Sequence, residues 1–170
     1  MTARRAVKGP GRRPRAAIRA PRSLGLRVAI AASRFNAVIT ARLVRAARAA
    51  LVAGGVDQRA VSVVYVPGAF ELPLAAQWLC RAGRYDAVIC LGAVIRGDTP
   101  HFEFISHAAS RGIMDVGLRE GRPVVFGVLT TDTAAQAEER ADPSGRNCGA
   151  ESARTALDMA LLARRLRAKE

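Results

Sequence analysis

The sequence has no long hydrophobic run and little cysteine. Its apolar segments, such as PVVFGVL at 123–129, are far shorter than the roughly 20 residues that a membrane-spanning helix needs. No hydrophobic secretory segment follows Met1, so we expect a soluble protein in a reducing cytoplasm. The cysteines are odd in number and scattered, which favours neither a disulfide framework nor a zinc site; they are Cys80, Cys90 and Cys148.

Two glycine-rich nucleotide-binding motifs are also missing. Neither GxGxxG nor GxxxxGK[ST] occurs anywhere in the chain. Their absence argues against a dinucleotide-binding fold and against a Walker-type NTPase, because both depend on a glycine-rich turn that cradles phosphate. The expected ligand is therefore another kind of small molecule.

Acidic residues are absent from the first 23 positions. This segment holds eight of the basic residues, so the formal net charge of +13 falls to +5 over the rest of the chain. It contains proline and glycine but almost no large apolar side chain, so it cannot offset the entropy lost on ordering. We predict a disordered basic extension at 1–23 and one folded domain at 24–170. Nonspecific nucleic-acid binding and an organelle transit peptide are the alternatives for the extension.

Short apolar runs alternate with longer amphipathic segments after residue 23. The apolar runs are rich in β-branched residues, as is typical of strands buried on both faces, and they span 26–32, 61–66, 86–94 and 123–131. Helical patterns cover 37–55, 70–84, 101–120 and two stretches after the last strand. This alternation predicts a three-layer α/β/α sandwich around a four-stranded parallel sheet.

Polar, small or aromatic residues follow every predicted strand. The segments are SRFN at 33–36, PGAFE at 67–71, IRGDTPHF at 95–102 and TTDT at 130–133. Ligands of such sheets bind in the crevice beyond the carboxyl ends of the strands. We therefore predict the functional site at this edge of the sheet.

The stretch LGAVIRGDTPHFEF concentrates the reactive side chains. Gly97 allows the chain to turn, and Pro100 suits the first turn of a helix because it has no N–H to leave unpaired. The free amides of a helix start favour phosphate, and His101 is placed to move protons near neutral pH. The alternative is purely structural: Asp98 or Thr99 caps the helix, and His101 supports it.

Other candidates also have structural interpretations. Phe35 and Phe126 could equally pack in the core, and Glu71 could pair with the positive end of a helix dipole. His107 lies six residues beyond His101 on the same predicted helix, away from the strand ends. We do not expect His107 at the site.

Five strings resemble one enzyme family when they are taken together. They are SRFNAVIT, VPGAFELPLA, LGAVIRGDTPHFEF, FGVLTTDTAAQAEERA and NCGAESARTALDMA, between about Leu24 and Leu162. In this order and at these separations they resemble the 6,7-dimethyl-8-ribityllumazine synthase family. The resemblance implies a flavodoxin-like sheet and the penultimate step of riboflavin biosynthesis. In that step 5-amino-6-(D-ribitylamino)uracil condenses with 3,4-dihydroxy-2-butanone 4-phosphate, without metal or organic cofactor, to give the lumazine, phosphate and water.

The same resemblance implies roles for individual residues. His101 transfers protons, and the butanone phosphate is bound by Asp98, Thr99 and Arg140. The ribitylaminouracil is bound by Phe35, Asn36, Ala69, Phe70, Glu71, Ala93, Val94, Ile95 and Phe126. Phe126 and Arg140 come from a neighbouring subunit, because the family forms homopentamers, sometimes twelve of them in a capsid. An N-terminal strand joins the adjacent subunit's sheet, and here it would begin near Pro21 to Ser23.

One position departs from the family pattern. Family members commonly have lysine in NKG where this chain reads NCG, with Cys148, and the preceding loop DPSGR is also unlike theirs. Both features concern the phosphate side of the site and pentamer packing, and Arg146 is a candidate replacement for the lysine. Cys148 therefore leaves open a catalytically weak relative that binds lumazine or flavin, and the net charge leaves open a basic nucleic-acid-binding protein.

Overall fold

The computed structural model describes residues 24–168. The predicted disorder at 1–23 and the strand expected near Pro21 to Ser23 lie outside the described residues. Strands and helices alternate along the described chain as β1 (Val28–Ser33), α1 (Ala37–Ala53), β2 (Val61–Val66), α2 (Leu72–Arg81), β3 (Ala87–Ile95), α3 (His101–Glu120), β4 (Val124–Thr131), α4 (Ala134–Ala141) and α5 (Cys148–Arg167). A short 3-10 turn, η1 (Gln58–Ala60), precedes β2.

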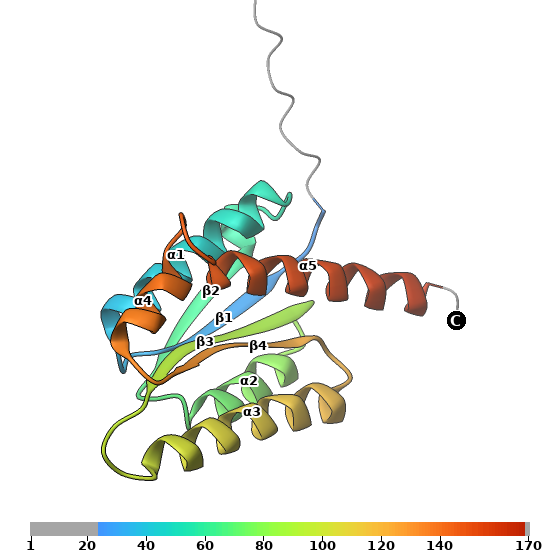
Figure 1. Cartoon of the computed structure of the whole chain (residues 1–170). Helices are drawn as coiled ribbons and strands as arrows, with labels where there is room; N and C mark the ends of the chain where they lie inside the picture. The colour runs from blue at the N-terminus through green and yellow to red at the C-terminus, as the bar shows by residue number, and fades with distance from the viewer. Residues whose placement is uncertain (1–23, 169–170) are drawn as a thin grey trace, which may run out of the picture.

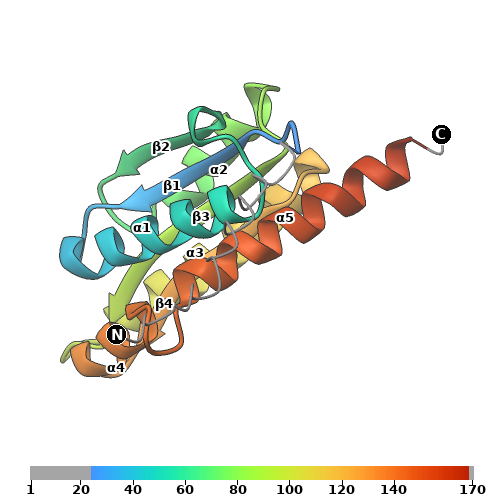
Figure 2. The ribbon, with the colours of Figure 1, turned by 90° about the horizontal axis from the view of Figure 1, so that it is seen from above.

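The sheet is four-stranded and all-parallel, in the order β2-β1-β3-β4. Helices α1, α4 and α5 cover one face, and α2 and α3 cover the other (Figure 1). The view from above shows α1 and α5 lying side by side along the same face (Figure 2). The predicted three-layer sandwich with a flavodoxin-like sheet is therefore confirmed.

Strand β1 explains why the sheet is buried at its centre. Every residue of β1 is buried, and successive side chains point to opposite faces. Val28, Ile30 and Ala32 join the apolar cluster under α1 and α5. Ala29 and Ala31 join the second cluster, under α2 and α3. One strand thus contributes to two cores.

The edge strand β2 differs from the prediction. Its sequence VSVVYV was expected to be buried on both faces, but Val64 is 37% exposed and Tyr65 is 51% exposed. Strand β2 has only β1 as a neighbour, whereas β1 has neighbours on both sides. The continuous apolar run therefore predicted the strand correctly, but the prediction that both of its faces are buried was wrong.

The helix ends follow local sequence signals. Helix α1 stops at Gly54, the first residue of the predicted glycine pair, and α3 occupies the predicted range of 101–120. Helix α5 ends with basic side chains in its last turn, where a positive charge favours the helix dipole. None of the described helices combines the length and the apolar composition needed to cross a lipid bilayer.

Arg164 of α5 joins the last helix to the start of the described chain. Its guanidinium donates hydrogen bonds to the main-chain oxygens of Leu24 and Gly25, each at 2.8 Å. It also lies 3.1 Å from the Asp86 carboxylate, just before β3. The segment that enters β1 is therefore held by α5.

Candidate active site

A cavity of about 610 Å³ opens beyond the carboxyl ends of β1, β2 and β3. It lies at the edge of the sheet that the strand-end segments predicted. Nine of the predicted site residues line it, and they are Phe35, Ala69, Phe70, Glu71, Ala93, Val94, Ile95, Thr99 and His101. Segments far apart in the sequence therefore meet around one space.

Phe35 combines an exposed ring with an anchored main chain. Its side chain is 70% exposed, so the core interpretation of Phe35 was wrong. Its N–H donates to Ser33 Oγ at 3.1 Å and to Pro67 O at 3.2 Å, and its carbonyl accepts from Thr40 Oγ1 at 3.3 Å. Ser33 and Thr40 are both buried. Buried hydroxyls thus fix the turn after β1 while the aromatic ring stands at the cavity.

Asn36 supports this turn from behind the cavity wall. It adopts the left-handed conformation, with φ 54°, directly before α1. Its side-chain Nδ2 donates to the main-chain oxygen of Ala93 at 2.9 Å. Asn36 is not among the lining residues, so its contribution is to join the end of β1 to the end of β3.

The carboxylate of Glu71 closes the turn after β2. Its Oε2 accepts a hydrogen bond from the Gly68 N–H at 2.8 Å. A side chain at position 68 would place its Cβ 3.1 Å from the same oxygen, so glycine allows this close approach without displacing the carboxylate. Among the described residues, the second oxygen of Glu71 has no hydrogen-bond partner. That oxygen is available to a ligand hydroxyl.

The first turn of α3 presents free amides and an exposed imidazole. Pro100 is the N-cap residue of α3, and no described side chain caps the helix there, so the capping interpretation of Asp98 and Thr99 was wrong. Thr99 and His101 line the cavity, whereas the exposed Asp98 does not. His107 is exposed farther along α3 and does not line the cavity either, as predicted.

Several lining residues were not given individual roles at the site, although all but Ile105 belong to the predicted strand-end segments. Phe102 and Ile105 lie three positions apart on α3, so they share the helix face that borders the cavity. Pro67, Gly68 and Gly97 complete the wall from the two turns. The signal for Phe102 was its place directly after His101, within a stretch that the sequence had already singled out.

Residues 25–164 match the model of the family described as 6,7-dimethyl-8-ribityllumazine synthase. The chain belongs to this family. The match covers every described strand and every residue that lines the cavity. Membership in the lumazine synthase family agrees with the four-stranded parallel sheet between two helical layers.

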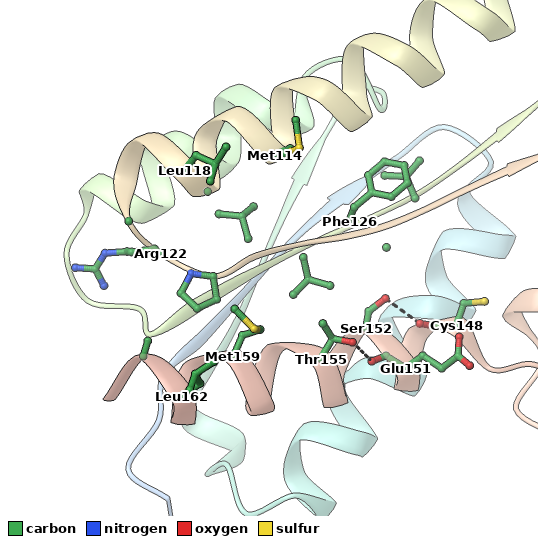
Figure 3. Close-up of a pocket in the computed structure, with 18 of the residues that line it drawn as sticks. Met114, Leu118, Arg122, Phe126, Cys148, Glu151, Ser152, Thr155, Met159 and Leu162 are labelled. Carbon is green, nitrogen blue, oxygen red and sulfur yellow. Dashed lines mark hydrogen bonds between the residues drawn. The ribbon is translucent and has the colours of Figure 1, made fainter. Parts of the chain in front are cut away.

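Phe126 lies in a different place from the other predicted site residues. It stands opposite Cys90 in the middle of β4, and it is 41% exposed, so the core interpretation was wrong for Phe126 as well. It lines a second cavity, of about 740 Å³, between α3, β4 and α5 (Figure 3). Within one chain, Phe126 therefore does not share a cavity with His101.

Arg140 is also outside the first cavity. It lies on α4, half-buried, and its guanidinium donates to the Gln136 main-chain oxygen at 3.0 Å. Its nearest carboxylate is that of Glu139, at 3.9 Å. The single chain thus brings nine of the predicted site residues together and leaves Asn36, Asp98, Phe126 and Arg140 outside the lining.

Cys148 opens α5 and lines the second cavity together with Phe126. It is half-buried and packs against the core under α1. Burial raises the pKa of the Cys148 thiol, the negative charge of Glu151 acts in the same direction, and Arg146 opposes both. Arg146 itself is exposed and lies 3.8 Å from the Glu151 carboxylate.

The charged groups of the site are not arranged to hold a metal ion. In the part of the chain that the structure describes, no group of three or more His, Cys, Asp or Glu side chains could hold one. The first cavity instead offers an aromatic ring, a carboxylate, main-chain groups at the end of β3, the amides of a helix start and an imidazole. These groups suit proton transfer on a flat, hydroxylated, phosphorylated set of ligands.

Proposed function

We propose that the protein condenses 5-amino-6-(D-ribitylamino)uracil with 3,4-dihydroxy-2-butanone 4-phosphate to give 6,7-dimethyl-8-ribityllumazine. The observation that carries this proposal is the single cavity in which Phe35, Glu71 and His101 meet. Residues 24–170 form the catalytic domain in this proposal, and 1–23 form a basic extension. The cytoplasm is the proposed location.

The two ends of the cavity suit the two substrates. The Phe35 ring stacks on the pyrimidine, and main-chain groups of Ala93, Val94 and Ile95 bind the uracil edge. The free oxygen of Glu71 accepts a hydrogen bond from the ribityl chain, beside Ala69 and Phe70. At the other end, Thr99 and the first amides of α3 bind the phosphate, because a helix N-terminus favours anions.

The chemistry proceeds through proton transfers. The uracil amine attacks the ketone, and loss of water gives an imine. Removal of the proton next to the imine expels inorganic phosphate and leaves an enol, which becomes a ketone. The ribitylamino nitrogen attacks this ketone, and loss of a second water closes the ring. His101, at the start of α3, is the group that accepts and returns these protons.

A neighbouring subunit completes the site in this proposal. Phe126 and Arg140 lie outside the first cavity of their own chain, and they reach a neighbour's site in a homopentamer. The apolar side chains around the second cavity support assembly: Leu118, for instance, is 76% exposed. Twelve pentamers could form a capsid. The phosphate then meets the guanidinium of Arg140 as well as the amides of α3.

Cys148 keeps one alternative function open. A relative that binds lumazine or flavin without efficient turnover would retain the ring of Phe35 and the carboxylate of Glu71. It would lack the lysine that family members have at the position of Cys148. A nucleic-acid-binding role would instead require basic and aromatic residues on the folded surface. Retention of a tail-deleted protein on RNA, lost at high salt, would support that third function.

Turnover of the two substrates tests the proposal directly. The full-length protein is mixed with both, lumazine formation is followed by absorbance and fluorescence, and phosphate release is measured in parallel. We expect equal amounts of lumazine and phosphate. Binding of lumazine without turnover would establish the alternative function and reject the proposed one.

A further inference from the structure

The side chain of Arg96 makes three contacts directly after β3. Its NH1 lies 2.6 Å from Glu103 Oε1, and its Nε donates to Asp132 Oδ1 at 2.7 Å. Its guanidinium carbon lies 4.3 Å from the centre of the Phe102 ring. Hydrogen bonds to Asp132 and Glu103 raise the pKa of the Arg96 guanidinium, which is positively charged at every pH of interest in any case.

These contacts join three separate elements. Asp132 directly follows β4, while Phe102 and Glu103 belong to the first turn of α3. The Arg96 N–H adds a fourth connection, because it donates to the Thr131 main-chain oxygen at 2.9 Å. One residue therefore connects the end of β3, the end of β4 and the start of α3.

The turn between Arg96 and α3 has little other support. Gly97, Asp98 and Thr99 are exposed and form no hydrogen bond with other described residues. A Cβ on Gly97 would meet no atom within 4 Å, so the chain is not packed there. The contacts of Arg96 bypass this turn and hold the helix that follows it.

The ring that Arg96 holds is part of the cavity wall. Phe102 lines the cavity together with His101, which is adjacent to it in the first turn of α3. A guanidinium over an aromatic face is attracted by the ring quadrupole. Because Arg96 contacts both Phe102 and Glu103, it restricts how the helical turn that carries His101 can move relative to the strand ends.

The contacts of Arg96 should affect the position of the reacting groups more than the stability of the fold. Exposed ion pairs contribute little to stability, and the side chains of Arg96, Glu103 and Asp132 are all substantially exposed. Catalysis is far more sensitive to such contacts, because a reacting group displaced by about 1 Å can lose on the order of 10²-fold in rate.

We propose that Arg96 is a positioning residue that sets the place of His101 and Phe102 at the cavity by joining the ends of β3 and β4 to the first turn of α3. The catalytic part of this inference rests on the function proposed above. The structural part concerns the order of residues 97–105 and is independent of that function.

Substitutions at Arg96 and at a matched ion pair test the inference. Arg96→Gln removes both ion pairs. Arg96→Lys retains a positive charge that can form an ion pair with one of the two carboxylates, Glu103 or Asp132. Arg111→Gln is the control, because Arg111 and Asp115 form an exposed pair at 3.8 Å farther along α3, outside the cavity. We expect kcat to fall about tenfold in Arg96→Gln and about threefold in Arg96→Lys, and to stay unchanged in Arg111→Gln. The melting temperatures of the Gln variants should be alike.

Amide hydrogen exchange provides the readout that does not depend on activity. In Arg96→Gln we expect faster exchange over 97–105, with unchanged exchange over 110–120 of the same helix as an internal reference. Faster exchange restricted to 97–105 supports the inference even if the wild-type protein turns over neither substrate, a result that would reject the proposed function alone. Unchanged exchange over 97–105 overturns the inference. Wild-type kcat in Arg96→Gln, or a loss of activity explained by general unfolding, also overturns it.

Discussion

The side-chain amide of Asn36 donates a 2.9 Å hydrogen bond to the main-chain oxygen of Ala93. Asn36 follows β1, and Ala93 lies near the end of β3, so the bond connects two sides of the cavity wall. Asn36 also adopts a left-handed backbone conformation, with φ 54°. One residue therefore satisfies a conformational requirement and a hydrogen-bonding requirement together.

Substitutions at Asn36 should separate these two requirements. Asn36→Gly removes the hydrogen bond, worth about 1 kcal/mol, and gives the unfolded chain more backbone freedom, but it introduces no strain at φ 54°. Asn36→Ala removes the bond and also places a Cβ in the left-handed region, which costs roughly 1 to 2 kcal/mol more. Thermal unfolding should therefore rank wild type above Asn36→Gly and Asn36→Ala last. Equal melting temperatures for the two variants would contradict the claim that the left-handed backbone conformation at position 36 disfavours alanine.

His101→Ala should lower turnover and leave folding and ligand binding largely intact. General acid–base groups typically contribute about 10² to 10⁴-fold, and here the substrates supply part of the proton transfer themselves, so we expect the low end or less. Steady-state kinetics with both substrates measures the effect. His107→Ala is the matched control, because His107 is exposed on the same helix but does not line the cavity. Unchanged turnover in His101→Ala would remove His101 from the proposed mechanism.

Cys148→Lys should restore a cation on the phosphate side of a site shared between subunits. A solvated, flexible lysine contributes less than a well-formed charged hydrogen bond, and we expect roughly 0.7 kcal/mol, or about a threefold lower KM for the butanone phosphate. The KM for the uracil should change little, and high salt should weaken the gain. The melting temperature should fall, because Cys148 packs against the core and lysine must leave it.

Cys148→Gln separates charge from size in this experiment, because glutamine is long and uncharged. It should lower the melting temperature and give no gain in KM. If the lysine and glutamine variants have the same KM for the butanone phosphate, Cys148 does not face the phosphate. An increased KM in the lysine variant would lead to the same conclusion.

The Cys148 thiol should react slowly at neutral pH. Only the thiolate is nucleophilic, and burial, assisted by Glu151, raises the thiol pKa above its usual value. The alkylation rate with iodoacetamide should therefore be below that of a free thiol at neutral pH and should keep rising at pH values where the free thiol has levelled off. Cys80 and Cys90 are buried and should react only on unfolding. Cys148→Ala identifies the signal, and fast labelling at neutral pH would contradict the prediction.

Sequence patterns predicted those parts of the fold that local chemistry determines. The glycine pair after α1 set the end of that helix, and the stretch from His101 to Glu120 became α3 without change. Burial of β2 could not be predicted in this way, because an edge strand and a central strand share the same apolar pattern. Which strand lies at the edge is decided by the order of the whole sheet.

The site, like the fold, has some features that local sequence predicts and others that depend on the tertiary structure. The rule that ligands bind beyond parallel strand ends placed Phe35, Glu71 and His101 at one cavity. The same rule did not place Phe126 at this cavity, because the apolar run at 123–131 already put Phe126 inside the predicted strand, well before its carboxyl end. The ion pair between Arg96 and Asp132 could not be predicted either, because Asp132 lies far from Arg96 in the sequence and meets it only when β3 and β4 pair.

The hydrogen bonds from Arg164 to the main-chain oxygens of Leu24 and Gly25 have a consequence for synthesis on the ribosome. The residues that lead into β1 emerge before every described strand, but α5, which holds them, emerges after all four strands. Much of the apolar face of α1 likewise stays exposed until α5 has been synthesised and packs against it. A nascent chain therefore carries a partly uncovered α1 until α5 has been made, and such exposed apolar surface is prone to aggregate. Stop codons that remove α5 should accordingly yield a chain that depends on chaperones, even though every strand of the sheet has been made.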